Sequence, residues 1–318
     1  MKKFFAFVLL VASGCVFASP VGLGTAGAFN AFALRNFTSS GSDTEGAVAA
    51  QGDVTLSSYS VNLLNQAGYA GDSLVVGGNL FFNSGAIAHG NAYVAGTKTT
   101  ANLGFSGSFD ARGAPFSFAD QANALNSLSA SLATVAGNGA TSFNPWGGVT
   151  FAGDGTNNPQ VFHVVGAALL QVNNISLVGL RPKSTLIFDI GGSQAGFKNV
   201  GMSDFANYNV LFNFFEAADL TLDGVGLYGT VLATKATVNG GGGQLNGNVV
   251  VNNWNSNIQI NRNHLFVDSD VAFLTSAAVH AVPEPGTLAL LIPMLALLWI
   301  SIRENARRQV TEHRSVSF

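Results

Sequence analysis

Short runs of apolar and polar residues, divided by glycine and asparagine, recur along most of the chain. Each run has a glycine, then a small or polar residue, then two or three apolar residues that favour strands. This loose repeat indicates coils that stack on one another and bury one continuous core. We therefore predict a mostly β, right-handed β-solenoid-like (β-helix) domain, and a β-sandwich with the same density of turns is the alternative. The clearest runs are residues 46–56, 72–82, 90–96, 226–233 and 245–251.

One segment has the period of a helix instead. Residues 117–135 place apolar side chains at steps of three and four, which predicts a packed amphipathic α-helix. Ser117 is the expected N-cap, with Asp120 three residues on, and Gly137 is the expected C-terminal stop. We expect this helix to lie along the solenoid and cover apolar surface without touching a ligand. Its apolar positions are Phe118, Ala122, Leu125, Leu128, Leu132 and Val135.

Residues 1–18 have the features of a secretory signal peptide. A basic start precedes an apolar stretch over residues 4–11, and small residues before the body predict cleavage by signal peptidase after Ala18. Cys15 is the single cysteine, so this cleavage would leave neither a disulfide nor a cysteine ligand. The alternative is a lipoprotein box over residues 12–15, in which Cys15 would carry a lipid.

The C-terminal end combines a polar signature, an apolar run and a basic cluster. Residues 287–302 are apolar and would span about 24 Å as a helix, slightly less than the roughly 30 Å of a bilayer core. The arginines that follow fit a cytoplasmic end under the positive-inside rule. This run therefore predicts a transmembrane helix, and residues 309–318 form a basic and polar tail behind it.

The order of these parts resembles the PEP-CTERM sorting signal, which the membrane protease-transpeptidase exosortase reads. Pro283, Glu284 and Pro285 match the Pro-Glu-Pro core of that signal, so the resemblance assigns residues 281–308 to sorting. It implies export, transient anchoring in the inner membrane, and then delivery to the cell surface or the extracellular space. An ordinary C-terminal membrane anchor is the alternative.

The composition of the remaining body, residues 19–280, suits a secreted β protein. The whole chain has 14 Lys and Arg against 17 Asp and Glu, and only 10% of its residues are charged while 47% are hydrophobic. Such a chain is too apolar for disorder, and it lacks the basic face that nucleic acid requires. Its 38 glycines fit a structure with many tight turns.

The body resembles the choice-of-anchor A domain, a bacterial surface domain found with different C-terminal anchors. Residues 23–32, 36–52 and 56–61 carry the opening likeness, and residues 229–233 and 240–247 look like the closing repeats of that family. The resemblance implies a secreted surface protein with no catalytic residues to transfer. The opening Leu-Gly-Thr-Ala and the helix among strands are also similar to ice-binding bacterial β-solenoids, as a likeness of fold only.

The acidic residues are the main candidates for chemistry. Asp219 and Asp223 share one strand face about 13 Å apart, beyond the roughly 5–9.5 Å of glycosidase carboxylates. Asp189 or Asp204 on a neighbouring coil could restore that distance, and three or more of these four in one groove would favour a glycan-active enzyme. Other acids could contribute to calcium sites but lack the remaining ligands of a recognised loop; these are Asp43, Glu45, Asp268 and Asp270.

The histidines, threonines and tryptophans give weaker signals. An ice-binding face needs Thr-x-Thr at one position of successive coils, and the threonines do not keep that spacing. Trp146 and Trp254 could stack on sugar rings, although core packing is the commoner role of such residues. The histidines lack metal-ligand spacing. The residues considered are Thr97, Thr99, Thr100, Thr230, Thr234, Thr237, His89, His163, His264, His280 and His313.

These patterns together predict a non-enzymatic surface or extracellular-matrix protein with a structural or adhesive role, associated with exopolysaccharide. Its expected sorting partners are signal peptidase and exosortase, and it is expected to need no metal or cofactor and to bind no nucleic acid. A β-solenoid polysaccharide-active enzyme is one alternative. An ice- or surface-binding adhesin is the other.

Overall fold

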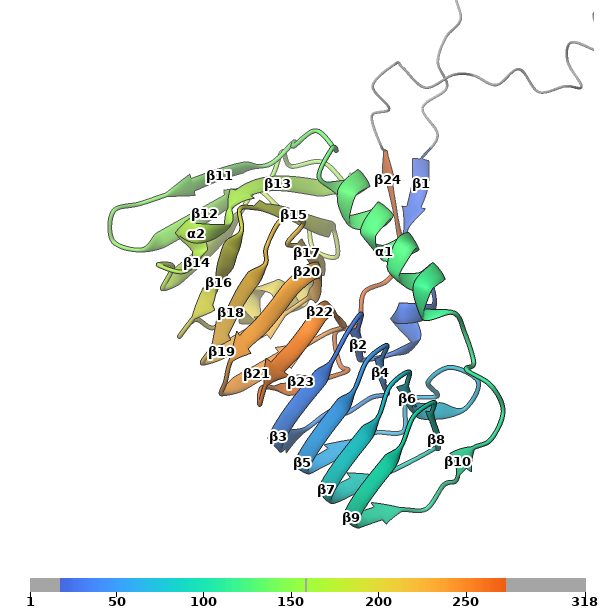
Figure 1. Ribbon diagram of the computed structural model, residues 1–318. Helices are drawn as coiled ribbons and strands as arrows, with labels where there is room; N and C mark the ends of the chain where they lie inside the picture. Colours follow the sequence, from blue (N-terminus) through green and yellow to red (C-terminus); the bar gives the residue numbers. More distant parts are fainter. Residues whose placement is uncertain (1–17, 158, 273–318) are drawn as a thin grey trace, which may run out of the picture. The chain divides into compact units, whose positions relative to one another are not determined.

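Parallel strands stacked into ladders are the main secondary structure of the described chain (Figure 1). The structure is a computed structural model that describes residues 18–157 and 159–272. The predicted sorting signal with its predicted transmembrane helix, and residues 1–17 of the predicted signal peptide, lie outside these residues. Within the described ranges, no helix is both long and apolar enough to span a membrane. The mostly β class is confirmed, and the 16-stranded sheet is a curled parallel half-barrel.

The first series of strands, called ladder A, runs the length of the half-barrel. Each strand pairs in parallel with the next. In spatial order the members are β10 (Phe109–Asp110), β8 (Asn91–Val94), β6 (Asp72–Val76), β4 (Val48–Ala50), β2 (Ala31–Ala33), β22 (Val249–Ser256), β20 (Thr230–Gly240), β17 (Asn209–Asn213), β15 (Thr185–Gly191) and β13 (Gln160–Val165).

The second series, called ladder B, shares two long strands with the first. Residues 231–233 of β20 pair with β22 in ladder A, and residues 237–240 pair with the same strand in ladder B after a register shift. All pairs of ladder B are parallel. In spatial order the members are β16 (Gln194–Lys198), β18 (Asp219–Asp223), β20, β22, β3 (Phe37–Asp43), β5 (Val54–Val61), β7 (Leu80–Ile87) and β9 (Lys98–Phe105).

Smaller elements complete the described body. Ladder C is a three-stranded parallel sheet, whereas the first and last strands of the described residues pair antiparallel, and so do β11 and β12. Ladder C contains β19 (Val225–Tyr228), β21 (Gly243–Asn246) and β23 (Gln259–Asn261). The others are β1 (Ala18–Val21) with β24 (Ser269–Ala272), β11 (Ala140–Phe143) with β12 (Gly148–Ala152) and β14 (Asn174–Val178), α1 (Phe118–Leu132), α2 (Gly166–Leu169), η1 (Gly24–Ala28) and η2 (Ser203–Asn207).

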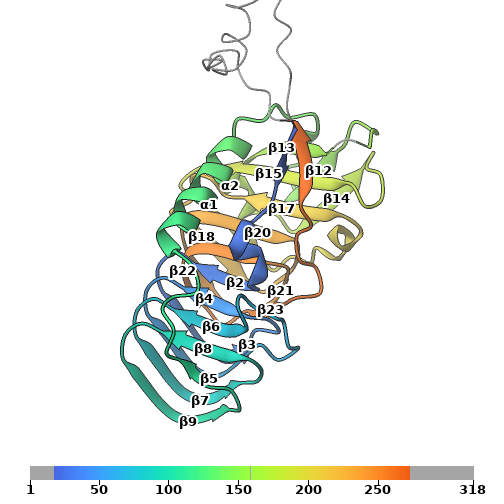
Figure 2. The ribbon, with the colours of Figure 1, turned by 90° about the vertical axis from the view of Figure 1, so that its right-hand side faces the viewer.

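The strands follow a different order in space than in the chain. The early strand β2 lies between β22 and β4. From β2 the chain winds through β4, β6 and β8 toward one end, α1 carries it to the other end, and β13 to β22 wind back to β2 (Figure 2). This parallel pairing differs from the antiparallel sheets of the β-sandwich alternative.

The inner strands of ladder A, from β6 to β15 in spatial order, are buried on both faces. In β15, alternate residues point into the half-barrel and toward α1, and five residues in succession are buried. Strands that are covered on both faces have continuous apolar sequences rather than alternating apolar and polar residues. On the inner face, Phe162, Phe188 and Phe212 are register partners whose rings stack with centroids 5.0 Å apart. Stacked identical side chains therefore fill the core from one strand to the next.

Helix α1 covers the outer face of ladder A (Figure 2). Its buried Leu125 and Leu132 pack in one apolar cluster with the outward residues of that ladder. Ser117 accepts a hydrogen bond from the amide of Asp120 at 3.2 Å, which confirms the predicted N-cap. The predicted stop at Gly137 is wrong, because the helix ends at Leu132. Tighter turns follow at once, in which the amides of Thr134 and Val135 donate to the carbonyls three residues earlier. The short helix α2 was not predicted.

Two buried asparagines join the N-terminal strands to the C-terminal ones. The Asn30 amide group donates to the carbonyl of Gly247 at 2.7 Å and accepts from the amide of Gly46 at 3.0 Å. Asn248 donates to the carbonyl of Phe29 at 2.8 Å. Both side chains are almost fully buried, and buried polar groups are costly unless hydrogen-bonded. These bonds therefore hold the junction between β2 and β22 in one register.

Candidate functional site

The exposed face of ladder B is built by a repeated three-residue pattern. A polar residue at the corner of the sheet is followed by an inward residue and then by an exposed one, as strand alternation requires. The pattern appears on both sides of the junction between β22 and β3. Its instances are Asn36-Phe37-Thr38, Asp53-Val54-Thr55, Asn79-Leu80-Phe81, Asn253-Trp254-Asn255, Thr237-Val238-Asn239 and Asp219-Leu220-Thr221. Thr97-Lys98-Thr99 occupies the same register on the last strand, where the middle residue is exposed.

The third residues of these triplets form one straight row, here called the central row. Neighbouring members are register partners on adjacent strands. Because strands lie about 4.8 Å apart, the row spans roughly 29 Å. All of its side chains are exposed except Thr221, which is half-buried. In spatial order the row is Thr221, Asn239, Asn255, Thr38, Thr55, Phe81 and Thr99.

The first residues of the triplets form a hydrogen-bonded edge beside the central row. The Asn36 side chain accepts from the amide of Asp53 at 2.9 Å, and the Asp53 carboxylate accepts from the amide of Asn79 at 2.7 Å. Asn79 accepts in turn from the amide of Thr97 at 3.0 Å, and Asn253 accepts from the amide of Asn36 at 3.2 Å. This chain of bonds fixes the corner, so the face beside it is rigid.

A third row, beyond the central one, completes the face. Ser40, Ser57 and Asn83 are register partners there, and a groove of about 530 Å³ runs along this part of ladder B. The strands bend away directly after the third row because the next residues have left-handed φ angles between 49° and 65°. Those residues are Gly41, Ser58, Ser84 and Asn102.

The central and third rows of this face carry no charge. Hydroxyl and amide groups make up the third row and nearly all of the central row, and Phe81 is the one large apolar side chain, 43% exposed. Asp53 is the one charged residue of the hydrogen-bonded edge beside the middle of these rows, and its carboxylate accepts hydrogen bonds from Asn79. The charged side chains of Lys198, Asp219 and Asp223 lie on the two strands at one end of ladder B, and Lys98 lies on the strand at the other. The face can therefore form many neutral hydrogen bonds with a flat partner, whereas attraction by charge is not available at its centre.

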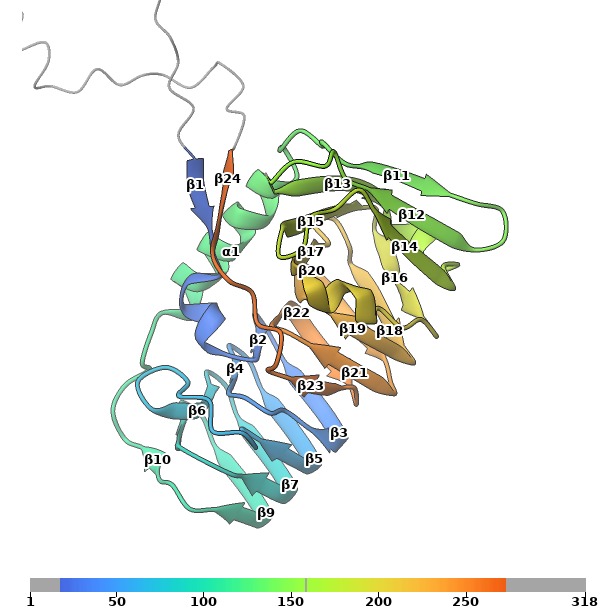
Figure 3. The same ribbon diagram turned by 180° about the vertical axis from the view of Figure 1, so that it is seen from behind.

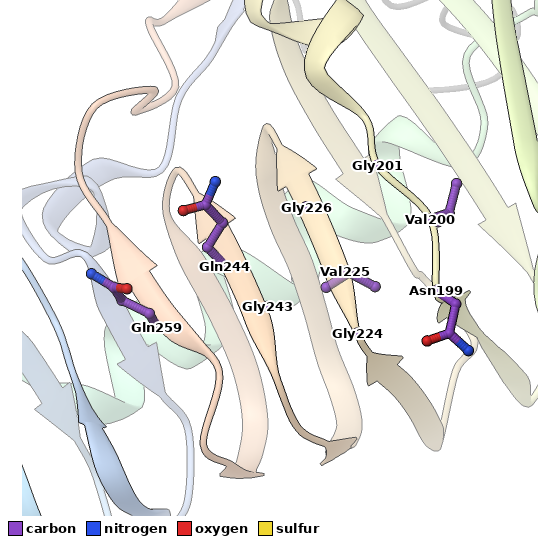
Figure 4. A pocket seen from close by; sticks show the side chains of 9 residues that line it. All are labelled: Asn199, Val200, Gly201, Gly224, Val225, Gly226, Gly243, Gln244 and Gln259. Carbon is purple, nitrogen blue, oxygen red and sulfur yellow. The ribbon is translucent and has the colours of Figure 1, made fainter.

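A second groove, of about 700 Å³, lies on ladder C (Figure 4). Gly201 and Gly226 leave part of its floor without side chains, and a Cβ at either position would meet no atom closer than 3.7 Å. The amide side chains of Asn199, Gln244 and Gln259 line it. This groove holds neither a carboxylate nor a nucleophile, so it offers no catalytic group.

The structure does not gather the four acidic residues proposed for an enzyme. Asp189 is buried on β15 of ladder A, whereas Asp204 is exposed in η2. Asp219 and Asp223 are exposed on ladder B. The acids therefore belong to three different parts of the body, and the arrangement expected of a glycan-active enzyme is not seen among the described residues.

Asp189 takes part in a buried polar network beneath α1. Its carboxylate accepts from the side chain of Asn213 at 2.8 Å, and Asn213 donates to the carbonyl of Ser129 on the helix at 2.9 Å. Burial raises the pKa of Asp189 to about 6, although the Asn213 bond and the nearby His163 both act to lower it. The second carboxylate oxygen has no partner. The network anchors the helix, and no substrate can reach it.

The proposed calcium ligands do not form a recognisable metal site. Within residues 18–157 and 159–272, no group of three or more acidic, histidine or cysteine side chains could hold an ion. Burial, and then the charge of Glu45, raise the pKa of Asp43. Glu45 itself accepts a hydrogen bond from the amide of Arg262 at 2.9 Å.

The spacing of the threonines and tryptophans in the sequence did not show which of them are buried and which are exposed on ladder B. Thr230 and Thr234 are buried, and Thr38 and Thr55, which the sequence analysis missed, lie side by side in the central row. The sequence did not show that Thr38 and Thr55 are neighbours, because the segments between successive strands of ladder B differ in length. Asn36 and Asp53, two residues earlier, mark the same position of each strand. Trp254 is 1% exposed, while Trp146 is 82% exposed. The two tryptophans therefore have different roles.

One family model accounts for most of this body. It matches residues 22–262 and is described as "Putative Ice-binding-like adhesive domain". The chain belongs to this family. The choice-of-anchor A resemblance stays a prediction. No curated protein and no solved structure matches the chain.

Proposed function

We propose that this protein is an exported surface adhesin whose ladder B face binds a neutral polysaccharide of the extracellular matrix. The observation that carries the proposal is the central row together with the third row beside it, in which uncharged hydroxyl and amide groups lie in register. The match to an ice-binding-like adhesive family supports an adhesive, non-enzymatic role at the cell surface. Adhesion needs no reacting group, and the scattered acids supply none.

The physical argument rests on rigidity and repetition. Threonine, serine and asparagine have short side chains, so fixing them on a partner costs less entropy than fixing lysine or arginine. The corner bonds of Asn36, Asp53 and Asn79 hold the strands before any partner arrives, which lowers the cost of binding further. Weak contacts repeated along a row of roughly 29 Å add up when the partner also repeats.

The terminal signals complete the proposal. Export would follow cleavage after Ala18 by signal peptidase, and exosortase would read Pro283, Glu284 and Pro285 at the inner membrane before delivery to the surface. We also propose that the body is a right-handed β-solenoid, for which the parallel pairing of ladders A, B and C is the support. Association with exopolysaccharide is the role expected of such a sorted protein.

Ice is a weaker candidate for the same face. Its lattice would require an unbroken series of equivalent groups, and Thr38 and Thr55 are the only adjacent threonines of the central row. Asn255 and Phe81 flank that pair. The mixture of amides, hydroxyls and one ring suits the varied hydroxyls of a sugar chain better.

Retention of the full-length exported protein on insoluble cellulose and insoluble dextran tests the proposal. The double variant Thr38→Glu with Thr55→Glu places two charges in the central row, and we expect at least a tenfold loss of retention. The control Ser131→Glu, on the exposed side of α1, should bind as the wild type does. Circular dichroism checks that all three proteins are folded.

Two outcomes would reject the proposal. In the first, neither polysaccharide retains the wild type; in the second, the double variant is retained as well as the control. Inhibition of ice growth by the wild type, lost in the double variant, would assign the face to ice instead.

A further inference from the structure

Trp146 is the most exposed large apolar side chain of the described residues, at 82%. It lies in the turn between β11 and β12, at the end of the body that carries β13 and β14 (Figure 3). A tryptophan this exposed forgoes most of the stabilisation that burial of its ring would give. Its indole N–H also has no hydrogen-bond partner among the described residues. The ring therefore contributes little to the stability of the fold.

The turn holds the backbone of Trp146 in place although its ring is free. The sequence Asn-Pro-Trp-Gly is typical of a tight turn, with asparagine first and proline second. The Asn144 side chain accepts from the amides of Trp146 and Gly148, both at 3.0 Å. Asn173, just before β14, donates from its side chain to the Trp146 carbonyl at 3.2 Å. The ring is thus presented from a fixed position.

A small polar groove of about 260 Å³ opens beside the ring. The groove is uncharged, because the side chains that line it carry amide or hydroxyl groups or belong to one valine and the tryptophan. Asn174 and Ser176 on β14 are register partners of Gly148 and Thr150 on β12, and the Asn144 side chain packs directly against Gly148. The lining residues are Asn144, Trp146, Gly148, Val149, Thr150, Asn173, Asn174 and Ser176.

We infer that this groove is a binding site for a single ring of a neutral sugar. A sugar ring has C–H groups on its faces, which can lie on the indole, and hydroxyls on its edge, which can reach the amides and hydroxyls of the groove. The volume falls below the roughly 300–1,000 Å³ of pockets for drug-sized ligands, which fits one ring rather than a longer stretch. The site is separate from the ladder B face, so this inference goes beyond the adhesion proposed for that face.

A lipid surface or a protein partner fits the same ring less well. Membrane-surface segments pair their aromatic residues with lysine and arginine, and none of the lining residues is basic. Buried protein interfaces need a larger apolar surface around the anchor, whereas the surroundings of Trp146 are mostly polar. Amide and hydroxyl groups beside an indole are the chemistry of sugar recognition.

Calorimetric titration of the full chain with maltotriose, cellotriose and chitotriose tests the site. We expect binding of at least one of them, with a change in tryptophan fluorescence. Trp146→Ala should weaken it at least tenfold, and Trp146→Phe should restore most of it because a ring remains. Asn174→Ala should weaken it several-fold. Phe143→Ala, a nearby ring that is 41% exposed, is the matched control and should bind as the wild type does.

The two sites can be distinguished with the same variants. Thr38→Glu with Thr55→Glu should bind the trisaccharide normally, and Trp146→Ala should still be retained on insoluble polysaccharide if the ladder B face is adhesive. Absence of binding by the wild type, or unchanged binding by Trp146→Ala, would overturn the assignment. Trp146-dependent binding to phosphatidylcholine vesicles without trisaccharide binding would overturn it in favour of a lipid surface.

Discussion

At the scale of single residues, buried polar side chains decide where strands meet. Asn30 and Asn248 bond across the junction between β2 and β22, and their partners are main-chain groups more than 200 residues away in the chain. Such bonds are directional, so a shifted register would leave several buried groups without partners. Asp189 differs from these asparagines because one of its carboxylate oxygens is unsatisfied.

The buried carboxyl of Asp189 should make stability depend on pH. Its pKa of about 6 exceeds the ordinary value of 3.8, so the folded protein binds the proton more tightly than the unfolded chain does. The stabilisation is complete below about pH 4 and is lost as the pH rises through about 6. Asp189→Asn should remove this dependence and raise stability near pH 8 by up to about 3 kcal/mol.

Urea denaturation at pH 4, 5, 6, 7 and 8 measures the effect. Asp204→Asn alters an exposed acid in η2 and serves as control, since it should keep the wild-type pH dependence. An Asp189→Asn variant that loses more stability at pH 8 than at pH 4 would show that the Asn213 and His163 neighbours favour the charged form after all, and an equal loss at every pH would show that burial does not shift the pKa of Asp189.

At the scale of elements, helix α1 closes the outer face of ladder A. Its buried side chains share a cluster with residues from β13, β15, β17, β20 and β22, so one helix covers strands from distant parts of the chain. Leu128 is only half-buried, whereas Leu125 and Leu132 are 2% and 0% exposed. The helix is marginal alone at 15 residues, and this packing stabilises it.

Truncation of Leu132 should therefore be costly. Leu132→Ala leaves a cavity against ladder A, and such changes typically cost about 2–5 kcal/mol. The neighbouring Ser131 is exposed, so Ser131→Ala should change stability by less than about 0.5 kcal/mol. Thermal unfolding compares the two variants. Equal melting temperatures would mean that α1 is held by its polar bonds to Asn213 rather than by burial.

Elements that depend on neighbouring residues could be predicted from the sequence, whereas the pairing of strands far apart in the chain could not. The helix over residues 118–132 was predictable because its period and its Ser117 cap lie within a few residues. The position of β2 beside β22 was not, since no local signal joins residues so far apart. The triplet pattern of ladder B was present in the sequence but spaced irregularly. The two tryptophans differed in context, as Trp146 lies in an Asn-Pro-Trp-Gly turn and Trp254 in a strand-like alternation.

At the scale of the whole molecule, the junction between β22 and β3 joins two series of parallel strands into one core. Phe37 and Trp254 stack across it with centroids 6.0 Å apart and an interplanar angle of 8°. The N-terminal strands extend from one side of this pair and the C-terminal strands from the other. In stacked repeats, stability depends on such interfaces between neighbours. The junction should therefore couple the unfolding of both halves.

Substitution of Trp254 tests this coupling. Trp254→Ala should cost about 3–5 kcal/mol because a fully buried ring is lost at the junction. Hydrogen exchange should then accelerate on both sides of it, in β5 and in β18, since neither half keeps its neighbour. Trp146→Ala removes the same side chain from an exposed position, and it should leave exchange in both strands unchanged. Faster exchange in β5 alone, with β18 still protected, would contradict this coupling. It would show that the C-terminal strands fold independently and that β2 and β3 then pack against their folded structure.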